Sequence, residues 1–301
     1  LLCVGTPLRD GSADLGDLLA AADAVDRVAP DGALVVIEST VPVGTTDLLA
    51  SRHPRLAWAV APERVLPGDA LREIAANDRV VGGAPEAAER AARLLRTICA
   101  GRVEVVDART AELAKLVENA SRDVELAFAN TVASLAEGFG VALPQLLELV
   151  RRHPRVRLLQ PGIGVGGHCL PVDPWFLVEA QPDRARLLAA ARSVNDAVPG
   201  AWVERIARHA GTIGLLGLSY KPDTDDRRAS PAVTIARTLA ETRDVLVHDP
   251  HGTEADLRSG SLDEVLGRDV VVHLVAHRAY RGLRARVRQG AVVVDAAGGW
   301  T

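Results

Sequence analysis

The chain has 301 residues, of which 48% are apolar and 25% charged, and its net charge is −4 at pH 7. These values are typical of a globular protein with two or three domains. The charge balance lacks the excess of basic residues that is typical of nucleic-acid binding. No apolar run approaches the ~20 residues of a membrane helix. No signal peptide is visible, and the three cysteines follow no disulfide spacing, which predicts a cytoplasmic protein with neither nucleic acid nor membrane as a partner.

Residues 1–107 alternate between strand and helix patterns. Such an alternation indicates an α/β domain with a parallel sheet. The predicted strands are Leu1–Val4, Ala33–Ile37, Leu56–Val60, Arg79–Val81 and Arg102–Val106, and the predicted helices are Asp17–Val28 and Pro85–Ala100.

Residues 108–209 show helical patterns without strand signals. A long helix is predicted from Thr110, as N-cap, to about Gly138, because apolar residues recur at helical spacing. Shorter helices are predicted over Leu143–Arg152, Arg184–Asn195 and Trp202–His209.

Residues 210–301 return to the α/β pattern, so the fold class is α/β with a helical middle. The predicted strands are Ile213–Leu218, Val245–His248, Val270–Val275 and Ala291–Val294, and a helix is predicted over Ala232–Glu241.

A glycine-rich segment, P-G-I-G-V-G-G-H-C-L-P-V-D, spans residues 161–173 and contains Cys169 and Asp173. Glycines let backbone N–H groups approach a ligand closely, and a cysteine after such a loop is placed like a nucleophile. Cys3 and Cys99 lie in apolar surroundings and are predicted to be packing residues. A zinc site of His168, Cys169 and Asp173 would lack the second ligand pair of structural zinc, so no metal is predicted.

Lysine is rare in this chain: only Lys115 and Lys221 occur among 35 basic residues. Lysine and arginine differ in shape, hydration and pKa, so a surviving lysine indicates a need for a primary amine. Lys115 and Asn119 are four residues apart on the long predicted helix and share one face. An ammonium and an amide placed together suit the stabilisation of an oxyanion, although a solvated polar face is the alternative.

Polar loops follow several predicted strands, at the end where open α/β sheets bind ligands. E-S-T-V-P-V-G-T-T begins at Glu38, and A-P-E-R-V-L-P-G contains Glu63 as a candidate base. The loop with Lys221 and Arg228 is cationic and suits a phosphate or diphosphate. Each loop could alternatively carry only capping or surface charges.

Taken together, these segments resemble one family. E-S-T-V-P-V-G-T-T, A-E-L-A-K-L-V-E-N, the P-G-x-G-x-G-G-H-C-x-P-x-D loop and K-P-D-T-D-D-x-R-x-S-P occur in the order found in UDP-glucose/GDP-mannose dehydrogenases. P-E-R-V-L-P-G, N-D-R-V-V-G-G and R-H-P-R-V look most like the branch that oxidises UDP-N-acetyl-D-mannosamine. The resemblance implies an NAD-binding Rossmann-like domain at 1–107, a central helical dimerisation domain at 108–209 and a Rossmann-like UDP-sugar-binding domain at 210–301.

The resemblance also implies a reaction: a four-electron oxidation of a sugar C6 alcohol to a carboxylate with two NAD, for cell-surface polysaccharide synthesis. Cys169 would form a thiohemiacetal and then a thioester. The resemblance implies that the remaining catalytic residues are Lys115, Asn119, Asp173 and Glu63. It implies that the NAD-binding residues are Thr6, Thr40 and Arg228. It also implies that the residues that bind a UDP-N-acetylhexosamine are Arg155, Gly162, Gly164, Gly166, Gly167 and Lys221. A homodimer through the central helical domain is expected, with Arg155 acting across it.

One family feature is missing from the sequence. No G-x-G-x-x-G turn joins a predicted strand to a predicted helix, although the NAD pyrophosphate usually rests on such a turn and on a helix N-terminus. We expect that roughly 70–100 residues of a dinucleotide fold precede Leu1 in the complete enzyme. The 301-residue chain alone is expected to bind NAD poorly and to turn over negligibly.

Other functions remain open on the sequence alone. The substrate can also be UDP-N-acetylglucosamine or UDP-glucose. A two-electron dehydrogenase of the hydroxyacid or 6-phosphogluconate type shares the paired lysine and asparagine but needs no Cys169. A non-catalytic remnant that binds nucleotide sugars is the third alternative.

Overall fold

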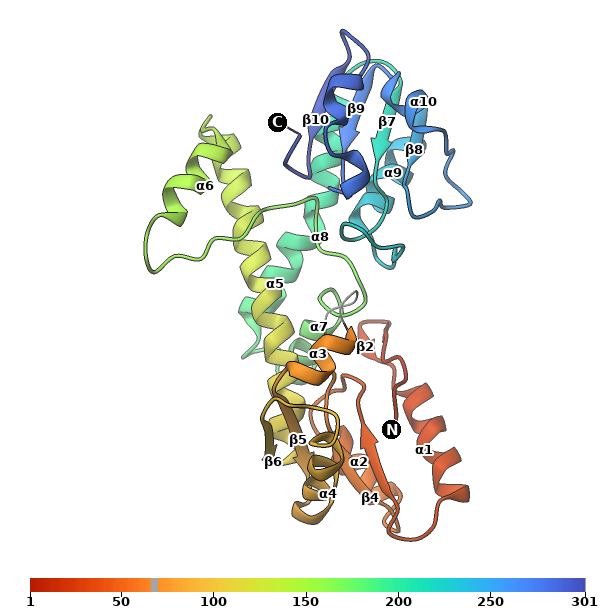
Figure 1. Ribbon diagram of the computed structural model, residues 1–301. Helices are drawn as coiled ribbons and strands as arrows, with labels where there is room; N and C mark the ends of the chain where they lie inside the picture. The colour runs from red at the N-terminus through yellow and green to blue at the C-terminus, as the bar shows by residue number, and fades with distance from the viewer. Residues whose placement is uncertain (66–69, 301) are drawn as a thin grey trace. The chain divides into compact units, whose positions relative to one another are not determined.

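The computed structural model describes residues 1–65 and 70–300 (Figure 1). The chain divides into two compact units. Unit 1 comprises Leu1–Ser121 and Val172–Arg186, and unit 2 comprises Arg122–Pro171 and Leu187–Thr301. The boundary falls inside helix α5 (Ala108–Gly138), which therefore contributes its first half to unit 1 and its second half to unit 2.

Unit 1 contains a four-stranded sheet in the order β3-β4-β5-β6. The strands are β3 (Leu34–Ile37), β4 (Ala57–Val60), β5 (Arg79–Gly83) and β6 (Val103–Val106), which confirms four of the predicted strands. The prediction of a wholly parallel sheet is wrong, because β4 and β5 pair antiparallel. That short pairing ends at Gly82 and Gly83, and a Cβ at Gly83 would lie 2.8 Å from the Trp58 carbonyl oxygen. Only glycine permits this approach.

The predicted strand Leu1–Val4 is reduced to one parallel bridge between Leu2 and Ile37. Leu2 donates to the Val36 carbonyl (2.8 Å), but the next backbone N–H in register, that of Val4, donates to Ser39 Oγ instead (2.8 Å). A side chain thus replaces the ladder and ends the strand. A small hairpin of β1 (Leu8–Arg9) and β2 (Ser12–Ala13) follows, which the sequence did not predict.

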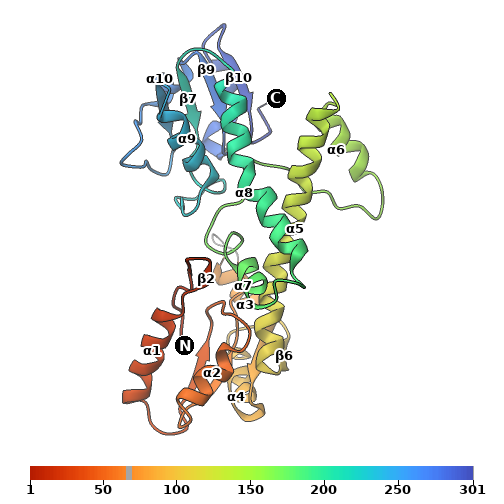
Figure 2. The same ribbon diagram turned by 180° about the vertical axis from the view of Figure 1, so that it is seen from behind.

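Helices cover both faces of this sheet (Figure 2). One apolar cluster joins β3 and β4 to Leu18 of α1, Leu49 of α2 and Ala111 of α5, and another joins the sheet to Ala88 and Leu95 of α4. The result is a three-layer α/β unit. Its other helices are α1 (Gly16–Val28), α2 (Thr45–Arg52), α3 (Ala70–Ala76), α4 (Pro85–Leu95) and α7 (Asp173–Ala180); α1 and α4 confirm predictions, whereas α3 and α7 were not predicted.

Unit 2 contains a fully parallel sheet in the order β10-β9-β7-β8, as predicted for the last third of the chain. Helix α9 packs on one face, and α10 with two 3₁₀ turns packs on the other. The elements are β7 (Ile213–Leu216), α9 (Pro231–Ala240), β8 (Val245–His248), α10 (Leu262–Leu266), β9 (Val270–His273), η1 (Arg278–Tyr280), η2 (Leu283–Arg286) and β10 (Val292–Asp295).

Helix α6 (Leu143–Arg151) lies beside the second half of α5, as Figures 1 and 2 both show. Helix α8 (Arg186–Ala207) is continuous, which corrects the prediction of two helices, and Pro199 lies within it. Thr110 is not the cap of α5. The helix begins at Ala108, and the Asp107 carboxylate accepts from the Thr110 N–H (2.9 Å) and hydroxyl (2.6 Å). None of the helices among the described residues has the length and apolar character that a membrane crossing requires.

The glycines predict opposite responses to alanine in the two units. A Cβ at Gly82 would meet the Ala111 Cβ at 2.6 Å and the Asp107 carbonyl at 2.7 Å, so Gly82→Ala forces β5 and α5 apart. It should lower the free energy of unfolding by about 1–3 kcal/mol. Gly200 is helical with nothing within 4 Å, so Gly200→Ala should raise it by about 0.5–1 kcal/mol. Urea unfolding of both variants checks this; equal effects would contradict the packing.

Candidate active site

Three of the predicted catalytic residues meet in unit 1. Lys115 and Asn119 lie on α5, and Asp173 is the first residue of α7. Asn119 Nδ2 donates to Asp173 Oδ2 at 2.5 Å, and the Asp173 side chain is buried. The structure thus brings together side chains that lie more than fifty positions apart in the chain.

Burial controls the charge of Asp173. Loss of hydration raises its pKa to about 6, while the hydrogen bond from Asn119 and the nearby Lys115 ammonium oppose that rise. A carboxylate with a pKa near neutrality can both hold and release a proton at physiological pH. Asp173 therefore has the protonation behaviour of a general base.

Glu63 lies in the loop after β4, where its carboxylate is surrounded by donors. It accepts from the backbone N–H groups of Arg64 (2.6 Å) and Val65 (2.9 Å) and from the buried Arg79 guanidinium (3.0 Å). Arg64 in turn pairs with Glu118 on α5 (2.6 Å), next to Asn119. These contacts fix the Glu63 loop to the helix that carries Lys115 and Asn119.

Two predicted cofactor residues are neighbours at the carboxyl end of β3. The Thr6 hydroxyl donates to the Thr40 carbonyl oxygen at 2.6 Å. This edge is where open α/β sheets hold their ligands. Thr6 and Thr40 therefore fit a nucleotide cofactor at this edge, whereas Arg228 belongs to unit 2.

Residues 161–171 of the glycine-rich segment lie in unit 2, and two side chains hold the start of this loop. The Gly162 N–H donates to Asn130 Oδ1 (3.0 Å), and Trp202 Nε1 donates to the Gly162 carbonyl (3.1 Å). Both backbone groups of Gly162 are therefore used within the protein.

The other three glycines pack against the loop that follows β7 and against the start of α9. A Cβ at Gly166 would lie 2.7 Å from Pro231 and 2.8 Å from Tyr220, and Gly167 (φ +92°) lies against the Tyr220 ring. Gly164 (φ +127°) lies against Pro231 in the same way, and the Gly167 N–H donates to the Arg228 carbonyl (3.0 Å). The glycines are thus required for close packing of the loop, a role that the sequence did not indicate.

Cys169 follows this docked loop and lies within electrostatic reach of Arg228 and Tyr220. Arg228 binds the Asp226 carboxylate at 2.6 Å, which lowers the pKa of Asp226 to about 2. Asp226 also faces His168 Nδ1 at 4.0 Å. A cation beside a cysteine favours its thiolate, the reactive form.

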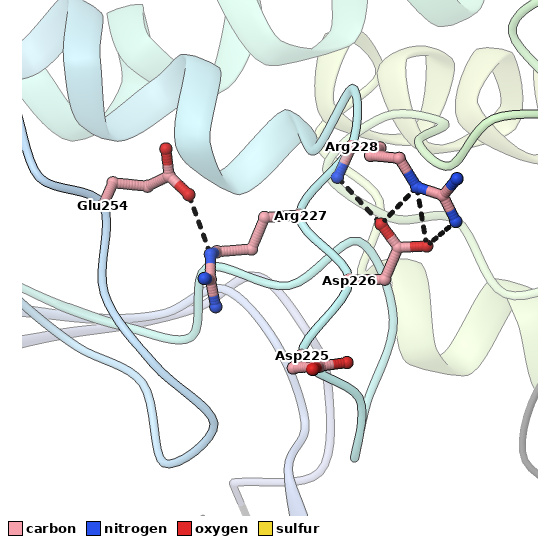
Figure 3. Close-up of a pocket in the computed structure, with 5 residues that line it drawn as sticks. All are labelled: Asp225, Asp226, Arg227, Arg228 and Glu254. Carbon is pink, nitrogen blue, oxygen red and sulfur yellow. Dashed lines mark hydrogen bonds and ion pairs between the residues drawn. The ribbon is translucent and has the colours of Figure 1, made fainter.

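Next to this group, a charged pocket of about 510 Å³ is lined by Asp225, Asp226, Arg227, Arg228 and Glu254 (Figure 3). Arg227 donates to Glu254 at 2.8 Å on one side, and Arg228 turns to Asp226 on the other. Lys221 lies over the Tyr220 ring, with Nζ 5.7 Å from the centroid. The predicted cationic loop is therefore a mixed-charge pocket.

Three further residues named from the sequence differ in their exposure to solvent. Arg155 is exposed in the turn after α6. Cys99 is buried as predicted, but Cys3 is exposed. Asp226 lies in the K-P-D-T-D-D-x-R-x-S-P motif and Tyr220 directly precedes it, but neither was assigned a role, and nothing in the sequence pointed to Glu254.

Among the described residues, one group has the spacing of metal ligands: Asp223, His251 and His277. Both ring nitrogens of His277 are already engaged, because Nδ1 accepts from the Asp223 N–H (2.9 Å) and Nε2 contacts Asp249 (3.2 Å). A metal would have to displace the protein's own hydrogen bonds there.

An α/β unit with polar residues at its strand ends and a second unit with a parallel sheet and a docked cysteine loop fit an enzyme that binds nucleotides. The chain belongs to the UDP-glucose/GDP-mannose dehydrogenase family and is an NAD-dependent nucleotide-sugar dehydrogenase. Profiles of this family match residues 1–99 (NAD binding domain), 109–197 (central domain) and 214–300 (UDP binding domain).

Relatives with more specific names agree over most of the chain. An NDP-N-acetyl-D-galactosaminuronic acid dehydrogenase of Ralstonia nicotianae is 43% identical over 100% of this chain and 78% of its own length. A UDP-N-acetyl-D-mannosamine dehydrogenase of Methanocaldococcus jannaschii is 40% identical over 93% of this chain and 69% of its own length. The solved UDP-D-ManNAc dehydrogenase of Pyrococcus horikoshii superposes with a TM-score of 0.90 at 35% identity, over 98% of this chain and 76% of that one.

The raised pKa of Asp173 predicts a pH-dependent cost in stability. The folded protein holds this proton up to about pH 6, whereas the unfolded chain releases it near 3.8, so stability is lost as pH rises through that window. Asp173→Asn escapes this loss. Relative to the parent, it should gain up to about 3 kcal/mol between pH 4 and pH 8.

Denaturant unfolding at both pH values checks the gain. Asp183→Asn is the matched control, because the Asp183 side chain is 96% exposed and should show no such change. A difference between Asp173→Asn and the parent that does not vary with pH would contradict the assignment.

Proposed function

We propose that the chain oxidises the C6 alcohol of a UDP-N-acetylhexosamine to the carboxylate, with UDP-N-acetyl-D-mannosamine as substrate. The observation that carries this is Cys169 on a docked glycine loop beside Arg228. A plain two-electron alcohol oxidation needs no such nucleophile. The galacto-configured sugar is the second candidate, supported by the 43% identical relative.

Cys169 is proposed to carry the second half of the oxidation. Its thiolate attacks the C6 aldehyde carbon and forms a tetrahedral thiohemiacetal. Loss of a hydride from that carbon gives a thioester, and water then cleaves the C–S bond, releasing the carboxylate and regenerating the thiol. Covalent capture keeps the aldehyde from escaping and divides one difficult oxidation into easier steps.

The residues of unit 1 are proposed to handle charge and protons. Lys115 and Asn119 stabilise the oxyanion as it develops on the substrate oxygen. Asp173, with a pKa of about 6, takes the proton from the C6 alcohol as it is oxidised or from the water that attacks the thioester. Glu63, held in place by Arg79 and two backbone N–H groups, positions water for thioester hydrolysis.

NAD, when bound, accepts one hydride in each of the two oxidations. Thr6 and Thr40 are proposed to hold it at the carboxyl end of β3, and Arg228 is proposed as a further NAD-binding residue. The domain boundaries proposed for these tasks are 1–107, 108–209 and 210–301.

Lys221 and Arg155 are proposed to bind the negatively charged nucleotide sugar, and Gly162, Gly164, Gly166 and Gly167 are proposed to shape the loop that contacts it. A cytoplasmic location is also proposed, supported by cysteines whose positions follow no disulfide pattern.

We further propose a homodimer through the second half of α5. An apolar groove of about 500 Å³ lies between α5 and α6. Phe128 (59%), Leu135 (53%) and Phe139 (78%) are largely exposed along it. A contiguous apolar surface of this kind is typical of an interface, and a self-complementary two-fold contact is the commonest way to bury it.

Cys169→Ser tests the covalent mechanism. It should reduce formation of the uronic acid from UDP-N-acetyl-D-mannosamine by at least 10³-fold, because a serine hydroxyl is a far weaker nucleophile than a thiolate. Mass spectrometry of the sugar product and calorimetric titration with the UDP-sugar measure activity and binding separately. Cys3→Ser is the control, since Cys3 is exposed and outside the loop.

Acid formation by Cys169→Ser would favour a two-electron mechanism without a thioester. If the parent chain bound the UDP-sugar but neither bound NAD nor formed acid, the proposed catalytic role would be withdrawn for this chain in favour of a binding remnant.

Phe139→Glu tests the dimer. Because Phe139 is 78% exposed, the substitution should leave the monomer folded while placing a charge in the apolar contact. Light scattering after size-exclusion chromatography should give a dimer for the parent and a monomer for the variant. Val28→Glu, 83% exposed on α1, is the control and should stay dimeric. A monomeric parent, or a dimeric Phe139→Glu, would refute this interface.

A further inference from the structure

A row of buried polar side chains runs between the second half of α5 and α8. Asp123 and Asn130 come from α5, and Arg192 and Asn195 come from α8. All four are buried, at 1%, 7%, 1% and 1% exposure respectively. Helix packing alone is achieved with apolar side chains, so four buried polar groups indicate a further task.

Every hydrogen bond in this row is donated toward Asp123. Arg192 Nη1 donates to Asp123 Oδ1 at 2.5 Å, and Asn195 Nδ2 donates to the same oxygen (2.8 Å) and to the Asp123 carbonyl (3.0 Å). The amide nitrogen of Asn195 must face Asp123, because these oxygens only accept. Its Oδ1 therefore faces Asn130, whose Nδ2 donates to it at 3.0 Å.

This order determines which atom Asn130 presents beyond the helices. With its nitrogen turned to Asn195, Asn130 points Oδ1 outward, and that oxygen accepts the Gly162 N–H at 3.0 Å. A flipped amide would place a donor against a donor. The charge pair of Asp123 and Arg192 thereby selects the orientation that the glycine loop requires.

Gly162 is one of the points at which the loop is hydrogen-bonded to the rest of unit 2, and Gly167 is another. Trp202 Nε1 binds its carbonyl (3.1 Å), and five residues later the Gly167 N–H binds the Arg228 carbonyl (3.0 Å). Cys169 follows two residues after the second point. A loop fixed at both points keeps the cysteine in a defined place, which covalent catalysis requires.

We infer that Asn130 and Asn195 are positioning residues for the Cys169 loop, with Asp123 and Arg192 setting their orientation. The inference rests on the proposed function only for the claim that the position of Cys169 matters to catalysis. The anchoring itself is a separate property and can be measured without activity.

Hydrogen–deuterium exchange of the full chain tests the anchor. In Asn130→Ala, amide exchange in a peptide covering residues 161–169 should be at least tenfold faster than in the parent. Trp202→Phe, which removes the other contact to Gly162 while keeping a ring, should give a smaller acceleration and serves if Asn130→Ala fails to fold. Thr131→Val is the matched control, because the Thr131 hydroxyl bonds only within its own helix, to the Ala127 carbonyl (2.8 Å).

Kinetic constants then distinguish misplacement of the Cys169 loop from a general loss of folded structure. Asn130→Ala should lower kcat at least tenfold with the KM for NAD within twofold of the parent, and Thr131→Val should change neither. Unchanged exchange in residues 161–169 for both Asn130→Ala and Trp202→Phe would overturn the inference, as would an equal acceleration throughout α5 and α8. If Cys169→Ser is inactive while the exchange is unchanged, only the positioning role fails; if Cys169→Ser still forms acid, only the proposed function fails.

Discussion

One helix imposes the main constraint on this structure. α5 is a single element of 31 residues, so the spacing of its polar side chains is fixed by helix geometry. Glu112 caps α2 through the Gly44 and Thr46 N–H groups, Asn119 binds Asp173, and Asn130 binds Gly162. Glu112, Asn119 and Asn130 therefore each organise a different segment. A shift in the helix would disturb all of them together, so strong packing at Gly82 is consistent with this role.

Three aspartate carboxylates have different roles because their surroundings differ. Asp123 is buried but paired with Arg192, and it orients neighbouring amides. Asp226 is paired with Arg228, which lowers its pKa to about 2 and keeps it ionised. Asp173 is buried with only an amide bond and a nearby lysine, so its pKa rises to about 6. With a pKa of about 6, Asp173 can exchange a proton near neutral pH, and the stability lost by ionising it is consistent with a functional rather than a structural carboxylate.

Sequence patterns predicted the periodic elements well, because strands and helices of one apolar face are local properties. The parallel sheet of unit 2 and helices α1 and α4 followed directly. The antiparallel β4–β5 pair, the capping by Asp107 and the continuity of α8 through Pro199 did not, since each depends on a contact that spacing does not encode. At the site, Lys115 and Asn119 were found because they are four residues apart on one helix. Glu254 and Asn130 were missed because tertiary packing alone brings them to their partners.

The glycine loop shows how a correct motif can carry an incomplete physical explanation. Its glycines suggested backbone N–H groups open to a ligand, yet the N–H groups of Gly162 and Gly167 are bound to protein oxygens, and Gly166 has no room for a Cβ. The absence of side chains therefore serves docking first. A fixed loop favours the proposed reaction, because the thiohemiacetal and the thioester form on the same sulfur and need the same geometry. The loop must be rigid. Buried amides such as Asn130 and Asn195 hold it through hydrogen bonds of defined direction, which apolar packing does not provide.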